Sequence, residues 1–193
     1  MKNLTIIAMV LAGASTARAH YVPVELGAFA GGHFFSATSH LGFLPDNPHT
    51  LSNTGAFGFR FALEVLPRLS LENELVLAPT QAVKTGDSVL YFGWHGHALV
   101  HFLTGRFRPF VLVGGGGITA SSANPTVVKE DTRGEVHAGL GAKLDIRCNW
   151  GLRVDARVQF EQGTAGIYFT EDWQVFGGMY GRFGKSIAEK CHK

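Results

Sequence analysis

Histidines that recur at every second position are the residues of this sequence with the most obvious chemical potential. His95, His97 and His101 alternate with apolar residues in one stretch, and His137 follows the same pattern in another. Alternate residues of a β-strand share a face, which would place His95 and His97 on one face about 7 Å apart. That spacing is wide for two ligands of one ion, and structural zinc needs further ligands close by. The sequence therefore favours hydrogen-bonding histidines, titrating near about pH 6–7, and predicts no metal or cofactor.

Acidic and basic residues follow the same two-residue period, and the two signs are balanced. The set comprises Arg60, Glu64, Glu72, Glu74, Lys143, Asp145, Arg147, Arg153, Asp155, Arg157, Glu161 and Arg182. A buried charge without a partner is very costly, so this balance suits an enclosed polar space better than a solvated surface. Asp155, between Arg153 and Arg157, is expected to form a ladder of ion pairs with the charges at 143–147 on the neighbouring strand.

The elements that must carry these charges are eight predicted strands, each with an apolar face opposite the polar one. Their approximate ranges are 22–36, 54–66, 69–77, 89–103, 110–119, two strands within 133–162, and 173–183. The run Gly114–Gly117 leaves the facing of the fifth strand ambiguous. The apolar face carries a loose girdle of aromatic residues at the strand ends. Its members are Trp94, Phe102, Phe110, Trp173 and Phe183.

Short and long connections alternate along the chain. The short ones are 66–68, 104–109 and 148–151, and the long polar ones are 37–53, 78–88, 120–132 and 163–172. This alternation is typical of outer-membrane barrels, which have short periplasmic turns and longer outer loops. The predicted fold is therefore all-β, an eight-stranded antiparallel up-and-down transmembrane β-barrel with a polar, ion-paired lumen. A secreted soluble β-sandwich, with the same apolar stripes turned inward, is the alternative.

The two ends of the chain indicate its compartment. A basic start, an apolar run of about ten residues and Ala17-Arg18-Ala19 predict a cleaved signal peptide at 1–19. Residues 20–184 would then form the barrel, and 185–193 a periplasmic tail. Cys148 and Cys191 would both lie on the oxidising periplasmic side, where they could form a disulfide, stay free or bond another chain. A formal net charge of +2 gives no indication of a nucleic-acid partner.

Enzymatic chemistry is not expected from the polar residues near the loops. A lipid A deacylase needs a lipid-facing Ser–His pair, whereas every strand histidine lies on the polar face, and Ser36, Ser39 and His40 lie at a loop edge. A protease would need acidic residues and histidines at the mouth of a larger barrel. The loop residues that could meet there are His40, Asp46, His49, Glu130, Asp131, Glu171 and Asp172. Solvated loop charges are the simpler interpretation, so no catalytic residue is assigned.

Several segments resemble the OmpA-like outer-membrane β-barrel domains, in the form found in myxobacterial-type outer membrane beta-barrel proteins. They are Arg108–Gly117, Asn149–Arg157, Tyr180–Gly184 and Leu69–Leu75 followed by 78–80. The resemblance covers essentially the whole mature chain. It implies a Gram-negative outer-membrane protein that contacts lipid, lipopolysaccharide and the barrel-insertion machinery, and it indicates no particular protein partner. The expected role is structural, in envelope integrity or surface contact. A narrow pore for ions or small solutes and a surface enzyme are the alternatives.

Overall fold

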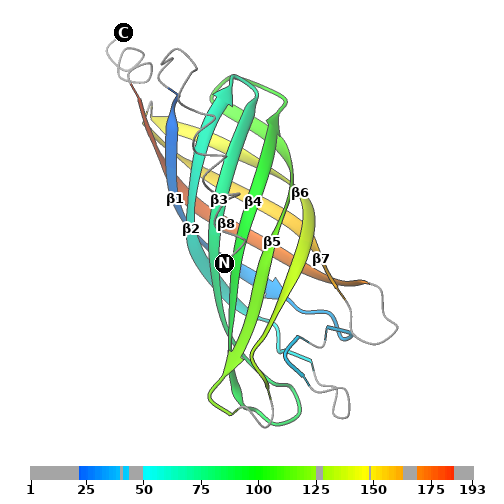
Figure 1. The fold of residues 1–193 in the computed structure, drawn as a ribbon. Coiled ribbons are helices and arrows are strands. Elements are labelled where there is room, and N and C mark those ends of the chain that lie inside the picture. Colours follow the sequence, from blue (N-terminus) through cyan, green and yellow to red (C-terminus); the bar gives the residue numbers. More distant parts are fainter. Residues whose placement is uncertain are drawn as a thin grey trace, which may run out of the picture.

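The computed structural model describes residues 22–39, 41–43, 50–124, 128–147, 149–162 and 169–184. Its strands are β1 (Val24–Phe34), β2 (Thr54–Leu66), β3 (Leu69–Gln81), β4 (Ser88–His101), β5 (Phe107–Ser122), β6 (Asp131–Arg147), β7 (Trp150–Gln162) and β8 (Phe169–Phe183). Each strand pairs antiparallel with the next, and β1 closes against β8 (Figure 1). The predicted all-β, eight-stranded up-and-down barrel is confirmed.

The two ends of the barrel differ in the length of their connections. Figure 1 shows the short β2–β3, β4–β5 and β6–β7 turns at the end where β1 begins and β8 finishes, and the longer connections at the other. We call these the turn end and the loop end. The predictions for the signal peptide, the tail and the Cys148–Cys191 bond concern residues outside the described ranges. Among the described residues, no helix is long and apolar enough to cross a membrane.

Several strands extend further toward the loop end than their apolar pattern predicts. β3 continues to Gln81, β5 to Ser122, and β6 begins at Asp131. Polar residues hold these extensions together, as where the Thr119 and Thr132 hydroxyls lie 2.9 Å apart across β5 and β6. The extensions carry polar residues on both faces, so the apolar residue at every second position is missing there. A prediction from the apolar pattern therefore ends each strand too early.

Apolar side chains cover the outside of the barrel and alternate with buried residues along each strand. Phe59, Leu140 and Val113 are 68%, 66% and 61% exposed, respectively. The girdle residues Trp94, Phe102, Trp173 and Phe183 also face outward. The placement of Phe110 in that girdle is wrong. On β5, Val111 and Val113 face outward, and Phe110 and Leu112, which alternate with them, point inward.

An apolar cluster closes the loop end of the lumen. It contains Leu41, Phe43, Leu51, Val76, Ala78, Ala82, Val89, Tyr91, Ile118, Ala120 and Val128, among others. Leu41, Phe43 and Val128 come from loops, while most of the rest point inward from β3, β4 and β5. The loops are fixed to each other by backbone bonds, including Lys129 N–H to the Gly42 carbonyl at 2.9 Å. We call this cluster the apolar plug.

Candidate functional site

The centre of the lumen is filled by a network of ion pairs. Arg153 donates through Nη1 to Glu72 Oε2 at 2.6 Å and through Nε to Asp155 Oδ1 at 2.7 Å. Arg60 reaches the same Asp155 oxygen from the opposite side at 2.9 Å. All four side chains are buried. Ion pairs of this geometry satisfy the charges that a closed barrel would otherwise leave without water.

Arg157 is the second hub of this network. Its Nη2 donates to Glu74 Oε1, and its Nε donates to the Gln174 side-chain oxygen at 2.6 Å. Arg60 Nη2 lies 3.2 Å from the other Glu74 oxygen and so joins the two hubs. The guanidinium of Arg157 therefore holds together residues from β3, β7 and β8.

The pairs form mainly across the lumen, and the expected ladder between neighbouring strands is absent from the described residues. The β6–β7 register places Gly141 opposite Asp155 and Gly139 opposite Arg157, so neither charge meets an opposite charge there. Lys143 lies opposite Arg153 and instead donates to Glu25 of β1 at 2.5 Å. Between β6 and β7 the expected neighbour pairs are thus replaced by contacts with distant strands, whereas Arg60 and Glu74 still pair across the neighbouring strands β2 and β3.

A second, half-buried network lies at the turn end. Glu64 accepts from Arg108 at 2.7 Å and from Arg182 at 2.6 Å. Asp145 accepts from Arg108 at 3.2 Å and from the Tyr180 hydroxyl. These contacts link β2, β5, β6 and β8 beneath the central hubs.

Arg147 departs from its predicted place in the lumen. The β6–β7 register shifts between Asp145 and Arg147, which leaves Ile146 as an extra residue. Because this bulge breaks the alternation of faces, Arg147 becomes exposed at the turn. It forms no ion pair with any residue of the described ranges.

Aromatic rings support the central cations from within. Arg60 lies over the Phe29 ring, 4.1 Å from its centroid, and Arg157 lies over Phe176 at 4.8 Å. Arg153 lies over Phe110 at 4.7 Å. Cation–π contacts of this kind strengthen when the groups are desolvated. The inward position of Phe110 thus serves the arginine network.

All four predicted lumen histidines are buried and contact polar partners. His97 Nδ1 lies 3.3 Å from Glu72, and His95 Nδ1 lies 3.6 Å from Glu74. The other two are bonded within the lumen, His101 to the Ser70 hydroxyl at 3.1 Å and His137 to Glu135 at 2.8 Å. The structure thus brings three of the four, His95, His97 and His137, into one cluster.

Toward the loop end, glutamines, a tyrosine and carboxylates take the place of the arginines. Gln174 Nε2 donates to Gln159 Oε1 at 2.9 Å, and Gln159 in turn donates to the Tyr91 hydroxyl at 3.0 Å. Asp172 accepts from the Ser36 backbone N–H at 2.7 Å and lies 3.5 Å from His33. Glu161 is bonded to hydroxyls of Ser39 and Thr170.

Among the residues considered for an enzyme mouth, those that the structure describes do not converge. Asp172 is buried in the lumen, whereas Glu130 and Glu171 are exposed. Asp131 is bonded to Arg133 at 2.7 Å, and His40, Asp46 and His49 lie outside the described residues.

Several lumen residues escaped the sequence analysis. They are Glu25, His33, Arg108 and Glu135, together with the lumen position of Asp172. The alternation itself could have revealed Glu25 and Glu135, because each lies next to an outward-facing apolar residue, Leu26 and Val136.

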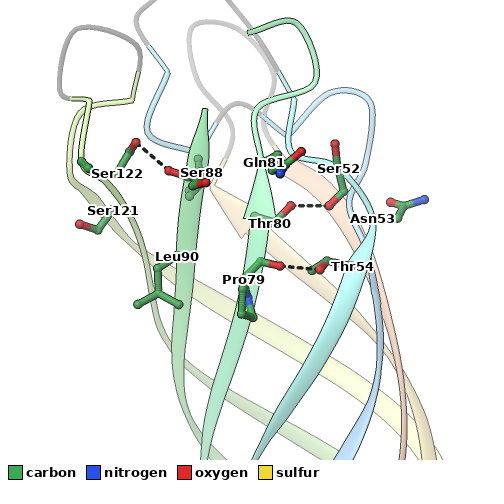
Figure 2. A pocket seen from close by; sticks show the side chains of 12 residues that line it. Ser52, Asn53, Thr54, Pro79, Thr80, Gln81, Ser88, Leu90, Ser121 and Ser122 are labelled. Atoms are coloured by element: carbon green, nitrogen blue, oxygen red, sulfur yellow. Dashed lines mark hydrogen bonds between the residues drawn. The ribbon is translucent and has the colours of Figure 1, made fainter. Parts of the chain in front are cut away.

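A polar groove of about 730 Å³ lies at the outer rim of the loop end. Figure 2 shows Thr54 donating to the Pro79 carbonyl, Thr80 to the Ser52 carbonyl and Ser122 to the Ser88 carbonyl. The remaining lining residues are Asn53, Gln81, Val89, Leu90, Ser121 and Ala123, so no lining residue is charged. At this rim, hydroxyl and amide groups take the place of the apolar side chains that cover the rest of the barrel exterior.

Comparison with known proteins identifies the fold but no family. Neither a protein-family model nor a curated protein matches the sequence. Neisserial surface protein A is 10% identical, with a TM-score of 0.62 over 84% of this chain and 97% of that chain. The outer membrane protein OprG from Pseudomonas aeruginosa is 12% identical, with a TM-score of 0.64 over 84% and 96%. The N-terminal β-barrel domain of Pseudomonas aeruginosa OprF is 15% identical, with a TM-score of 0.56 over 83% and 97%. At these identities the likeness concerns the fold alone, and this chain has the small closed barrel of those proteins.

Proposed function

We propose that this chain is an integral outer-membrane protein of a Gram-negative cell, with an OmpA-like barrel that serves envelope integrity and surface contact. The observation that carries the proposal is the distribution of polarity: apolar side chains face outward and the charges are buried inside. In water this arrangement would expose the apolar surface and desolvate the ions. In a bilayer the apolar surface meets lipid, the closed barrel leaves no backbone group unpaired, and the buried ions pair with one another.

A structural role is favoured over conduction because the lumen is filled. Arg157, Lys143 and Gln174 are among the largest fully buried side chains. Above them, the apolar plug closes the loop end with Leu41, Phe43 and Val128. A permeant ion would have to displace paired charges and then cross an apolar barrier.

The loops and the rim are the surfaces available for contact. The polar groove begins where outward apolar residues of β3 and β4, such as Leu75 and Phe92, give way to Gln81 and Ser88. Hydroxyl and amide groups at this level suit the headgroups and sugars of outer-leaflet lipid, including lipopolysaccharide. Enzymatic activity is not part of the proposal, since the strand histidines point into the lumen, away from lipid.

We expect the protein to fold as a barrel that does not conduct ions. Protein refolded in detergent is expected to migrate differently on gels before and after boiling, and to produce no steady conductance in a planar bilayer. Steady channel steps from the folded band would instead support the pore. Solubility without detergent, together with an unchanged mobility, would restore the soluble sandwich and contradict the proposal.

A second prediction concerns the outward tryptophans. Trp94 and Trp173 are 53% and 52% exposed on the barrel exterior, whereas Trp150 lies half-buried beside the β6–β7 turn. In vesicles with brominated acyl chains, tryptophan fluorescence is expected to be strongly quenched. Bromine quenches only an indole that it contacts, and lipid-facing tryptophans contact the acyl chains. Quenching should fall sharply in the Trp94→Phe/Trp173→Phe variant, which keeps Trp150. Equal quenching of both proteins would mean that these faces do not contact lipid.

A further inference from the structure

Three imidazole rings meet inside the barrel from two strands that are not neighbours. His95 and His97 come from β4, and His137 comes from β6. The His97 and His137 ring centroids lie 4.5 Å apart, those of His95 and His137 lie 5.3 Å apart, and those of His95 and His97 lie 6.1 Å apart. The spacing of histidines along the chain could not reveal this cluster. The cluster forms because β4 and β6 both pair with β5, which lies between them.

Glycines in β4 and β5 make room for the rings. Gly114 lies between His97 and His137 in the pairing register. A Cβ at Gly114 would approach His137 Nε2 to 2.6 Å, and one at Gly93 would approach His95 Nε2 to 2.8 Å. The space that the rings occupy therefore depends on the absence of these side chains.

Two carboxylates complete the cluster. Single ligand atoms of Glu74, His95 and His97 all lie within 4.8 Å of one another, and all three residues are buried. Glu135 bonds His137 Nδ1 at 2.8 Å and lies 3.9 Å from His95 Nε2. A carboxylate that accepts from Nδ1 leaves Nε2 as a lone-pair donor, which is the usual support for a metal-bound histidine.

The cluster contains buried polar atoms that have no hydrogen-bond partner within the described part of the chain. They are both ring nitrogens of His95, Nδ1 of His97, Nε2 of His137 and Oε2 of Glu74. His95 is 1% exposed and His137 is 3% exposed, so bulk water does not satisfy these atoms. Buried polar groups without a partner are costly, so these five atoms are available to a bound ligand.

The charge of the lumen also leaves room for a cation. Among the described residues the buried carboxylates are Glu25, Glu72, Glu74, Glu135, Asp155, Glu161 and Asp172, against Arg60, Arg108, Lys143, Arg153 and Arg157. This differs from the even balance that the sequence suggested, because Glu25, Glu135 and Asp172 were not counted there. Glu135 is paired with His95 and His137.

We propose that this cluster binds one divalent transition-metal cation of the zinc, cobalt or nickel class. Glu74, His95 and His97 are the ligands, His137 is the fourth, and Glu135 orients His137. Imidazole and carboxylate donors select such ions over calcium or magnesium. Ligand atoms in a tetrahedral site lie roughly 3.3 Å apart, so the side chains must close in from their present separation. Arg157 Nη1 lies 3.4 Å from His97 Nε2, and the surplus carboxylates offset the charge that the ion adds beside this guanidinium.

The untagged full chain, refolded in detergent with zinc or with chelator, is the sample that tests for the ion. Folding is checked by gel mobility, and bound metal is measured by elemental analysis after dialysis. About one zinc ion per folded chain is expected, with a higher unfolding temperature in zinc than in chelator. Refolding in the presence of zinc removes the need for the ion to pass the plug.

Matched variants locate the ion. His95→Gln/His97→Gln is expected to lose it, and Glu135→Gln to weaken binding by about 10–100-fold. His101→Gln should retain it, because His101 is a buried lumen histidine of the same strand that bonds Ser70 outside the cluster. Cobalt should give the visible bands of a four-coordinate nitrogen and oxygen site. Equal metal content in the double variant, thiolate bands from Cys148 or Cys191, or folded protein without metal would overturn the proposal.

Discussion

Replacing Arg157 by methionine is expected to destabilise the barrel strongly. Methionine keeps most of the volume but leaves Glu74 buried without its shortest ion pair and Gln174 without its donor. Removing one partner of a buried pair costs about 3–5 kcal/mol, because the other charge stays desolvated. The free energy of unfolding, measured by urea titration of the refolded protein in vesicles, should fall by that amount.

Two further variants separate the lost ion pair from a general effect of removing an arginine. Arg147→Met is the matched control, since Arg147 is exposed at the β6–β7 turn, and its free energy of unfolding should change by less than about 0.5 kcal/mol. In Arg157→Met/Glu74→Gln the stranded charge is gone, so much of the lost stability should return. A loss below about 1 kcal/mol in Arg157→Met would mean that Arg60 alone satisfies Glu74.

The strands and their facing were predictable because lipid-facing positions repeat at every second residue. The range of β2, Thr54–Leu66, agrees with its prediction, and Phe57, Phe59 and Phe61 all face outward. The short turns were predictable from Pro67 and from the segment before Gly151. Local pattern suffices here, because the alternation of faces is a property of a single strand.

The partners across the lumen were not predictable, because they depend on how the closed sheet is staggered. From the sequence, Lys143 could have paired with any nearby carboxylate. The β6–β7 register places Arg153 opposite Lys143, and Lys143 pairs with Glu25 of β1 instead. The histidine cluster has the same origin, since His137 reaches His97 only through Gly114 of β5. A single bulge was enough to move Arg147 out of the lumen.

The sequence left open which residues of β5 face the lumen, because glycine is neither polar nor apolar. In the structure each glycine of the strand lies on a definite face. Gly116 shares the inward face with the buried Leu112 and Ile118, whereas Gly117 lies on the outward face with Val113. A Cβ at Gly116 would stand 2.0 Å from the Trp94 carbonyl oxygen and 2.9 Å from the His95 Cα. Backbone atoms cannot move aside as a side chain can, so the glycine fixes how closely β4 and β5 approach.

Gly116→Ala and Gly117→Ala are therefore expected to change stability in opposite directions, although both add the same methyl group. At Gly117 the nearest atom to a Cβ is the Arg133 carbonyl oxygen at 3.9 Å, and alanine in a strand gains roughly 0.5–1 kcal/mol over glycine. At Gly116 the same gain is outweighed by overpacking, which costs about 1–3 kcal/mol and sometimes more when backbone must shift. Urea titration and the fraction of folded band on unheated gels measure both. Equal stability of the two variants would show that β4 and β5 can separate at this point without loss, which would contradict a tightly closed wall around the histidine cluster.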